Sequence, residues 1–124
     1  MINGIGVDIV EVKRMERWLG NTKLLERYFH TDELTLASTR KNTAAQTLAA
    51  RFAAKEAFTK ALGTGFEKIN LKDIMVYNRE NGKPEIKLFA SAKRALEKSG
   101  SCKVHISLTH EKENAIAMIV LEET

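Results

Sequence analysis

The sequence predicts an α+β domain in which an antiparallel sheet packs against a long central helix. Three observations support this fold class: an alternating N-terminal segment, a long alanine-rich segment without Gly or Pro, and a continuously apolar segment near the C-terminus. Strands placed before and after a group of helices are typical of α+β proteins. The 124 residues are enough for one domain, which we place at residues 1–124.

The first segment, residues 2–10, alternates between two faces and predicts a strand. One face is apolar and carries Ile5, Val7 and Ile9. The opposite face carries Gly4, Gly6, Asp8 and Val10. Glycine weakens a strand unless another backbone or a ligand must come close. The two glycines therefore predict a close approach on the face that carries the aspartate.

Short helices are expected next, at residues 11–19 and 24–29. Thr31 precedes two acidic residues and predicts an N-cap that opens a further helical turn. The clearest element is a long helix over Thr43–Leu62, with Gly63 near its C-terminal cap position.

The C-terminal half predicts strands around one helix. Residues 71–77 and 84–89 are expected to form two strands, joined by a turn at Asn81-Gly82. A helix over residues 91–98 is closed by Gly100.

A final hairpin is predicted from residues 103–109 and 114–121. Its second strand is continuously apolar, so we expect it to lie centrally with both faces covered. Cys102, just before the hairpin, is the one cysteine, which excludes an intramolecular disulfide. We expect it to be a small buried or half-buried residue, since no activating base for a catalytic thiol is identified.

Composition narrows the function classes. The net charge of +4 suits an acidic partner or a phosphate-rich ligand. A nucleic-acid partner fits the charge, but only 6% of the residues are aromatic and no stacking array is visible. The sequence contains no apolar run of about 20 residues, so we expect no membrane span. Asp8 and Glu11 interrupt the first apolar run and no basic region precedes it, so we expect no signal peptide and a cytoplasmic protein.

Asp8 is the first candidate site residue. A carboxylate among Gly, Ile and Val must be paired, capped or bound to a cation if it is buried. A strand-end aspartate that caps the following helix is an equally simple interpretation. The neighbouring glycines favour a site.

The long helix carries a second group of candidates. Arg51 and Lys55 are one turn apart, as are Glu56 and Lys60. One interpretation is a solvated face with ion pairs worth about 0.2–0.5 kcal/mol each. The other is a site for a metal-bound diphosphate, with Glu56 as an oxygen ligand of Mg²⁺ and Lys60 neutralising phosphate charge. The turn at Gly63-Thr64-Gly65 would bring backbone N–H groups to a phosphate, although it is not a P-loop.

A third group lies on the strand at residues 103–109. Alternation places His105, Ser107 and Thr109 on one face. A strand exposed on one side explains this pattern equally well. A serine hydrolase is a poor interpretation because Ser107 lacks a nucleophile elbow, and the three histidines lack a metal-ligand spacing.

Taken together, the three groups resemble the holo-acyl-carrier-protein synthases, the small class of phosphopantetheinyl transferases. The matching stretches are residues 4–11 with Arg14, residues 51–60 with 63–65, and residues 105–110; residues 31–34 and 81–84 also fit the family pattern. Residues 37–47 match poorly. The resemblance implies an α+β homotrimer with active sites between subunits. It also implies coenzyme A as donor, a serine of apo acyl carrier protein as acceptor, and a role in fatty acid biosynthesis.

The resemblance further implies roles for individual residues. Asp8 and Glu56 would hold Mg²⁺, and Lys60 would act with them in catalysis. The candidates for holding the nucleotide and its 3′-phosphate are Arg51, Lys55, Lys60, Gly63, Thr64, Gly65, His105 and Thr109. Arg14, with Lys13 and Arg17, would meet the acidic helix of the carrier protein.

One position departs from the larger, two-repeat transferases. They place a further carboxylate two residues after the first metal-binding aspartate, where this chain has Val10. The third metal position is then left to water or substrate. The general base is open: Glu56 acting through a metal-bound water is the first candidate and Asp8 the second. A basic binding module without catalysis, or an inactive relative that binds coenzyme A, are the competing hypotheses.

Overall fold

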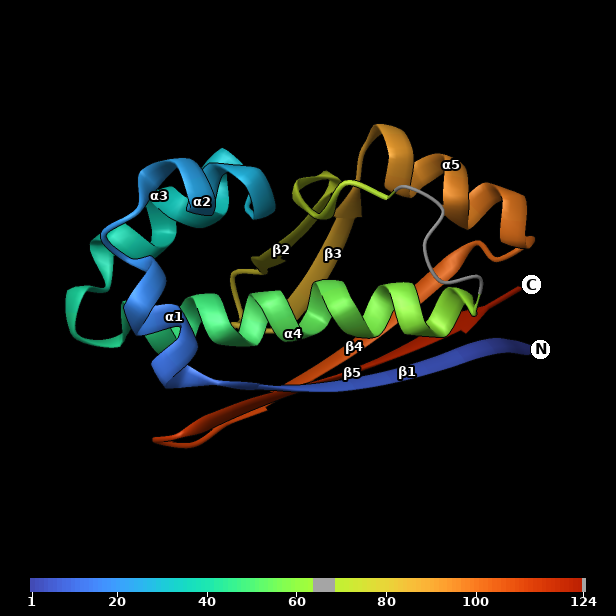
Figure 1. The fold of residues 1–124 in the computed structure, drawn as a ribbon. Helices are drawn as coiled ribbons and strands as arrows, with labels where there is room; N and C mark the ends of the chain where they lie inside the picture. Colours follow the sequence, from blue (N-terminus) through green and yellow to red (C-terminus); the bar gives the residue numbers. More distant parts are fainter. Residues whose placement is uncertain (64–68, 124) are drawn as a thin grey trace.

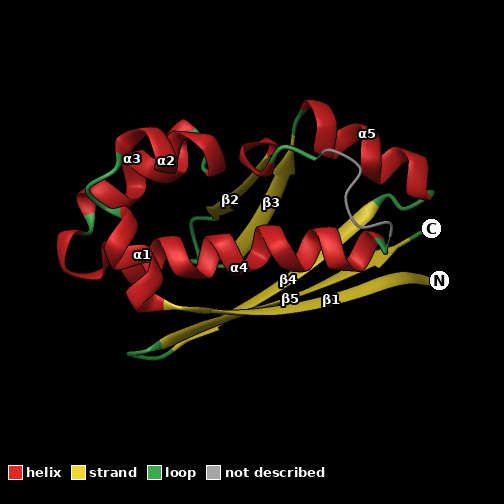
Figure 2. Ribbon diagram, viewed as in Figure 1, coloured by secondary structure: helices red, strands yellow, loops and turns green. Residues whose placement is uncertain are grey.

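A 19-residue helix, α4 (Ala44–Leu62), lies across a three-stranded antiparallel sheet and organises the rest of the chain (Figures 1 and 2). The structure is a computed structural model that describes residues 1–63 and 69–123. The sheet has the strand order β1 (Ile2–Glu11), β5 (Asn114–Glu122) and β4 (Lys103–His110). The prediction of an α+β fold with an antiparallel sheet against a long helix is confirmed.

The remaining helices lie on the side of α4 that faces away from this sheet (Figure 1). Three short helices gather near the start of α4: α1 (Val12–Trp18), α2 (Thr22–Tyr28) and α3 (Thr31–Thr39). A separate hairpin is formed by β2 (Ile74–Asn78) and β3 (Pro84–Leu88), preceded by a 3-10 turn at Leu71–Asp73. The last helix, α5 (Ala90–Ser99), lies near the C-terminal end of α4.

The helix ends agree with those predicted from the sequence, except at the start of α3. Gly63 and Gly100 end α4 and α5 with φ of 74° and 84°, in the left-handed region that glycine adopts without steric cost. The cap of α3 is His30 rather than Thr31, which is the first helical residue. His30 accepts from the backbone of Asp32, and Glu33 accepts from the backbone N–H of His30 at 2.9 Å. Because of this reciprocal capping, the helix begins at Thr31, one residue earlier than the sequence predicted.

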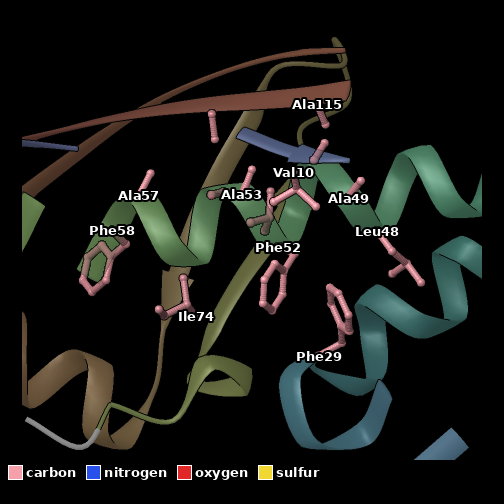
Figure 3. Close-up of a cluster of buried hydrophobic side chains, with 14 of the residues drawn as sticks. Val10, Phe29, Leu48, Ala49, Phe52, Ala53, Ala57, Phe58, Ile74 and Ala115 are labelled. Atoms are coloured by element: carbon pink, nitrogen blue, oxygen red, sulfur yellow. The ribbon is translucent and has the colours of Figure 1, made fainter. Parts of the chain in front are cut away.

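The core has two halves, one on each side of α4 (Figure 3). Small residues of α4, such as Ala53 and Ala57, face Val10 and Ala115 of the sheet. On the other side, Phe52 packs near Phe29, with their ring centroids 6.2 Å apart. The alanines allow the sheet to approach closely, and the aromatic rings fill the wider space under the short helices.

The two glycines of β1 are needed because a backbone, not a ligand, comes close to them. A Cβ at Gly4 would lie 2.0 Å from the carbonyl oxygen of Ala61, and one at Gly6 would lie 1.9 Å from that of Ala57. No real Cβ makes such contacts, so a side chain at either position would push β1 away from α4.

We therefore expect Gly6→Ala to lower the free energy of unfolding by about 1–3 kcal/mol or more, measured by urea denaturation. Gly20→Ala is the matched control, because a Cβ there meets nothing within 4 Å. Equal stability of the two variants would show that β1 and α4 are less tightly packed than described.

The sheet face that points away from α4 is open and apolar. On β1, Ile5, Val7 and Ile9 are 58%, 55% and 59% exposed. They adjoin Ile116 and Met118 of β5, which are also exposed. The prediction that β5 is central is confirmed, but the expectation that both its faces are covered is wrong for a single chain. A row of apolar side chains left open to water is typical of an interaction surface.

Two further observations concern the surface. Cys102 was expected to be at least half-buried, but its side chain is exposed at the edge where the chain enters β4. Within residues 1–63 and 69–123, no helix combines the length and apolar character that crossing a bilayer would require.

Candidate active site

Asp8 projects from β1 toward α4, as the alternation predicted. It pairs with Ala117 of β5 and shares the sheet face that packs on the helix. Its side chain is only 17% exposed. A carboxylate with so little access to water needs a positively charged or hydrogen-bonding partner.

Lys60 supplies that partner from α4. Its ammonium donates to Oδ1 of Asp8 at 2.8 Å and to the carbonyl oxygen of Val7 at 3.2 Å. Side chains on a helix lean toward its N-terminus, so Lys60 reaches back over the preceding turn. That turn carries Glu56, and the three side chains form one charged cluster between β1 and α4.

Glu56 is half-buried in this cluster, and its pKa is raised above the ordinary value. Burial is the main cause and the negative charge of Asp8 is the second, while Arg14 and Lys60 act in the opposite direction. A half-buried carboxylate whose ionisation is opposed by a neighbouring carboxylate is typical of a functional site that accepts a cation.

Arg14 lies at the edge of the same cluster. Its guanidinium carbon is 5.2 Å from the ring centre of Trp18 and 4.9 Å from that of Phe52. These two rings form a cation–π support that orients the arginine. The sequence pattern did not reveal this role of the aromatic residues, although Arg14 and Trp18 are one helical turn apart. Lys13 and Arg17 are exposed on the same short helix.

The Asp8–Glu56 pair fits a hard divalent cation. Mg²⁺ binds carboxylate oxygens, and one or two protein carboxylates are enough because waters and substrate phosphates complete its coordination. In the described part of the chain, no group of three or more His, Cys, Asp or Glu side chains could enclose a metal ion. A set of two carboxylates suits a metal that is shared with a phosphate ligand.

Lys55 does not face this cluster, and the expectation that it contacts a nucleotide is corrected. It is fully buried, and its ammonium donates to Oε1 of Glu33 at 2.7 Å, to the carbonyl oxygen of Leu71 at 3.0 Å and to that of Ile74. Burial lowers the pKa of Lys55, and the buried Glu33 carboxylate opposes that shift. All three donor positions of the ammonium are used within the protein, so Lys55 joins α4 to α3 and β2.

Arg51 is also buried, on the part of α4 near the β2–β3 hairpin. It donates to Oδ1 of Asn78 at 2.6 Å. Among the described residues its Nε finds no hydrogen-bond partner. Burial lowers the pKa of Arg51; the charge of Glu33 opposes this shift, and the charge of nearby Arg40 adds to it. A buried guanidinium with an unused donor beside a second arginine is suited to an anion. No sequence pattern pointed to Arg40, which lies in the segment that matches the family poorly.

His105 and Thr109 lie on the opposite side of the sheet from Asp8. In the strand register, His105 is next to Val120 and then Ile5, and Thr109 is next to Ile116. His105 contacts Glu122, with 2.9 Å between Nε2 and Oε1, and this hydrogen bond lowers the pKa of Glu122. Both candidates therefore belong to the open apolar face.

The predicted phosphate turn is only partly described. Gly63 is the left-handed C-cap of α4. Thr64 and Gly65 lie outside the described residues. Within one chain the structure therefore brings together Asp8, Glu56 and Lys60, and leaves Arg51 and the His105 face at separate places.

Comparison with known proteins identifies the family. Residues 4–119 match the 4′-phosphopantetheinyl transferase superfamily. The holo-[acyl-carrier-protein] synthase of Treponema denticola is 52% identical over 122 residues, which cover 98% of this chain and 99% of that protein. The Geobacter sp. synthase is 46% identical over 125 residues, covering 98% and 99%.

Solved structures agree with these sequence matches. The holo-(acyl-carrier-protein) synthase of Bacillus anthracis, in complex with CoA (3′,5′-ADP), superposes with a TM-score of 0.83 at 39% identity and covers 100% of this chain and 99% of its own. The Helicobacter pylori synthase, in complex with coenzyme A, gives 0.81 at 30% identity, covering 95% and 99%. A full-length match in sequence and fold, with the carboxylate pair in place, shows that this chain belongs to the 4′-phosphopantetheinyl transferase superfamily.

Proposed function

We propose that the chain is a holo-[acyl-carrier-protein] synthase, which transfers 4′-phosphopantetheine from coenzyme A to a serine of apo acyl carrier protein. The products are holo carrier protein, for use in fatty acid biosynthesis, and adenosine 3′,5′-bisphosphate. The observation that carries this proposal is the Asp8–Glu56 pair beside Lys60, in a chain that matches synthases over its whole length. Relatives in complex with coenzyme A support the choice of donor.

The reaction exchanges one phosphorus–oxygen bond for another. The serine oxygen attacks the β-phosphorus of the coenzyme A diphosphate, and the bond from that phosphorus to the bridging oxygen breaks. The serine proton goes to a base, for which we propose Glu56, with Asp8 as the second candidate. A raised pKa makes Glu56 a stronger base than an ordinary glutamate, as a general base requires.

Charge on the diphosphate must be neutralised during this exchange. Mg²⁺ held by Asp8 and Glu56 would supply Lewis-acid stabilisation of the phosphate oxygens. Lys60, whose long side chain is more than half exposed, is placed to bind the same oxygens. Gly63, with the two residues that follow it, remains our proposal for backbone N–H contacts to phosphate.

Arg51 is our proposed contact for the 3′-phosphate of coenzyme A. Its buried Nε lacks a partner among the described residues, and a phosphate oxygen would satisfy it. Arg14, with Lys13 and Arg17, presents positive charge next to the catalytic cluster. We propose that this surface of α1 receives the acidic helix of the carrier protein and mainly sets the association rate.

Some candidate site residues lie far from Asp8 within one chain, which suggests that the site is completed in an oligomer. We propose a homotrimer in which the open apolar face of one subunit packs against its neighbour. His105 and Thr109 lie on that face, so each would complete a site that holds Asp8 and Glu56 of another subunit. Exposed apolar side chains such as Val7 and Met118 provide the driving force for this association.

Mixing of inactive variants tests the shared site. Glu56→Gln removes one half of the proposed site and His105→Ala the half that the neighbouring subunit would supply, so each variant alone should transfer much more slowly. Refolding a mixture of the two should restore part of the transfer activity, because some sites would then combine two intact halves. If the mixture stays as inactive as its components, both halves belong to the same subunit.

The transfer itself is tested by mass spectrometry. The chain, Mg²⁺ and coenzyme A should add one phosphopantetheine to an apo acyl carrier protein of bacterial type. Chelation should stop the reaction and excess Mg²⁺ should restore it. Carrier protein with its acceptor serine changed to alanine is the control. No mass gain with several bacterial carrier proteins would reject the proposed function.

A further inference from the structure

In this structure the carboxylate proposed to bind the metal already holds a cation. The ammonium of Lys60 lies 2.8 Å from Oδ1 of Asp8 and 3.2 Å from the carbonyl oxygen of Val7. We propose that Lys60 occupies the place of the divalent cation on Asp8, leaves it when the cation binds, and thereby becomes available to the diphosphate. This inference rests on the proposed function for the identity of the phosphate ligand.

Because Asp8 is mostly buried, its carboxylate needs a positively charged partner when no metal ion is bound. Its side chain is 17% exposed, so water alone hydrates it poorly. The lysine side chain, by contrast, is 54% exposed, and among the described residues its ammonium bonds only to these two oxygens. Asp8 is therefore fixed in the fold, while the Lys60 side chain is able to move.

Lys60 neutralises only part of the negative charge in the cluster, so the cluster still attracts a divalent cation. Lys60 neutralises Asp8, but no salt bridge of Glu56 is formed among residues 1–63 and 69–123. The cluster thus keeps an attraction for a divalent ion that a single ammonium does not satisfy.

The ammonium and a divalent cation exclude each other at the same oxygen. Mg²⁺ binds carboxylate oxygens at about 2.0–2.1 Å. An ammonium at hydrogen-bond distance from that oxygen would then face a double positive charge a few ångströms away, a repulsion that is large in a partly buried site. Loss of the bond to Asp8 leaves Lys60 with the weaker acceptor on Val7 and a free ammonium beside the site.

The first test measures divalent binding without coenzyme A or carrier protein. Mn²⁺ binding, followed by electron paramagnetic resonance, should be about fivefold tighter in Lys60→Gln than in the unchanged chain, as expected for loss of one competing ion pair. Lys93→Gln, an exposed lysine on α5, is the control with the same charge change and should bind Mn²⁺ as the unchanged chain does. Coenzyme A binding in saturating Mg²⁺ should change in the opposite direction and become weaker in Lys60→Gln.

The second test observes the ammonium directly. In protein labelled with ¹⁵N at lysine, the Lys60 ammonium signal should shift when Mg²⁺ is added, and this shift should be absent in Asp8→Asn. Three results would overturn the inference. They are equal Mn²⁺ affinity of the Lys60→Gln and unchanged chains, a Lys60 chemical shift that does not change when Mg²⁺ is added, and no divalent binding by either chain. Because neither primary readout involves transfer, a failed transfer assay would reject the proposed function and leave these results standing.

Discussion

Replacing Glu33 with glutamine is expected to lower the free energy of unfolding by about 3–5 kcal/mol. The carboxylate is buried and accepts from the Lys55 ammonium, from the backbone of His30 and, at 3.0 Å, from the backbone of Val76. The glutamine fills the same space but leaves the buried ammonium without its counter-charge. Urea denaturation at neutral pH measures the loss.

The pH dependence of this variant gives a second measurement. Burial lowers the pKa of Lys55, and Glu33 opposes the shift, so the pKa should fall further in Glu33→Gln. The unfolded chain then binds more protons than the folded one below the ordinary lysine pKa, and stability should recover as the pH rises. Glu85→Gln, which breaks the exposed pair with Arg79, is the control and should cost less than about 1 kcal/mol. Similar losses for the two variants would contradict a structural role for the buried pair.

Replacing Glu56 with glutamine should reduce transfer by about 10²–10⁴-fold without lowering stability. The variant loses the proposed metal ligand and base together. The raised pKa of Glu56 means that the folded chain holds this proton more tightly than the unfolded chain. Stability from this group is therefore present at low pH and is lost as the pH rises through the folded-state pKa. Removing the charge removes that cost, so at pH 7 the variant should melt at the same temperature or higher.

Turnover in the mass assay and a thermal melt measure the two effects. Glu97→Gln, on the exposed side of α5, is the control and should keep normal turnover. Near-normal turnover of Glu56→Gln would mean that Glu56 is neither ligand nor base. A large fall in melting temperature would mean instead that its charge stabilises the fold.

Much of the fold could be predicted because local signals agree with it. Alternation in residues 2–10, the glycine after Leu62 and the apolar run at residues 115–121 each predicted an element that the structure contains. The start of α3 was placed one residue late because a histidine cap depends on the reciprocal bond from Glu33, which composition alone does not reveal. The exposure of Cys102 depends on where the sheet edge lies and left no local signal.

The site was predicted less evenly. Asp8, Glu56 and Lys60 do meet, since a strand face and a helix face both have a fixed period. Lys55 was assigned to the wrong environment because α4 is buried on most sides and its alanines hide which face meets the sheet. A lysine next to a candidate ligand in sequence points about 100° away from it on a helix. Only the tertiary partner Glu33, 22 residues earlier in the chain, reveals its role.

The close contacts between β1 and α4 also constrain chain length. Gly4 meets Ala61 and Gly6 meets Ala57, so the strand and helix run in opposite directions and are matched at two successive points. One inserted residue between Ala57 and Ala61 would rotate the helix by about 100° at one contact relative to the other. An insertion before Lys60 would then turn its ammonium away from Asp8. Insertions and deletions should therefore be tolerated in the loops around α1 to α3 but not between these paired points.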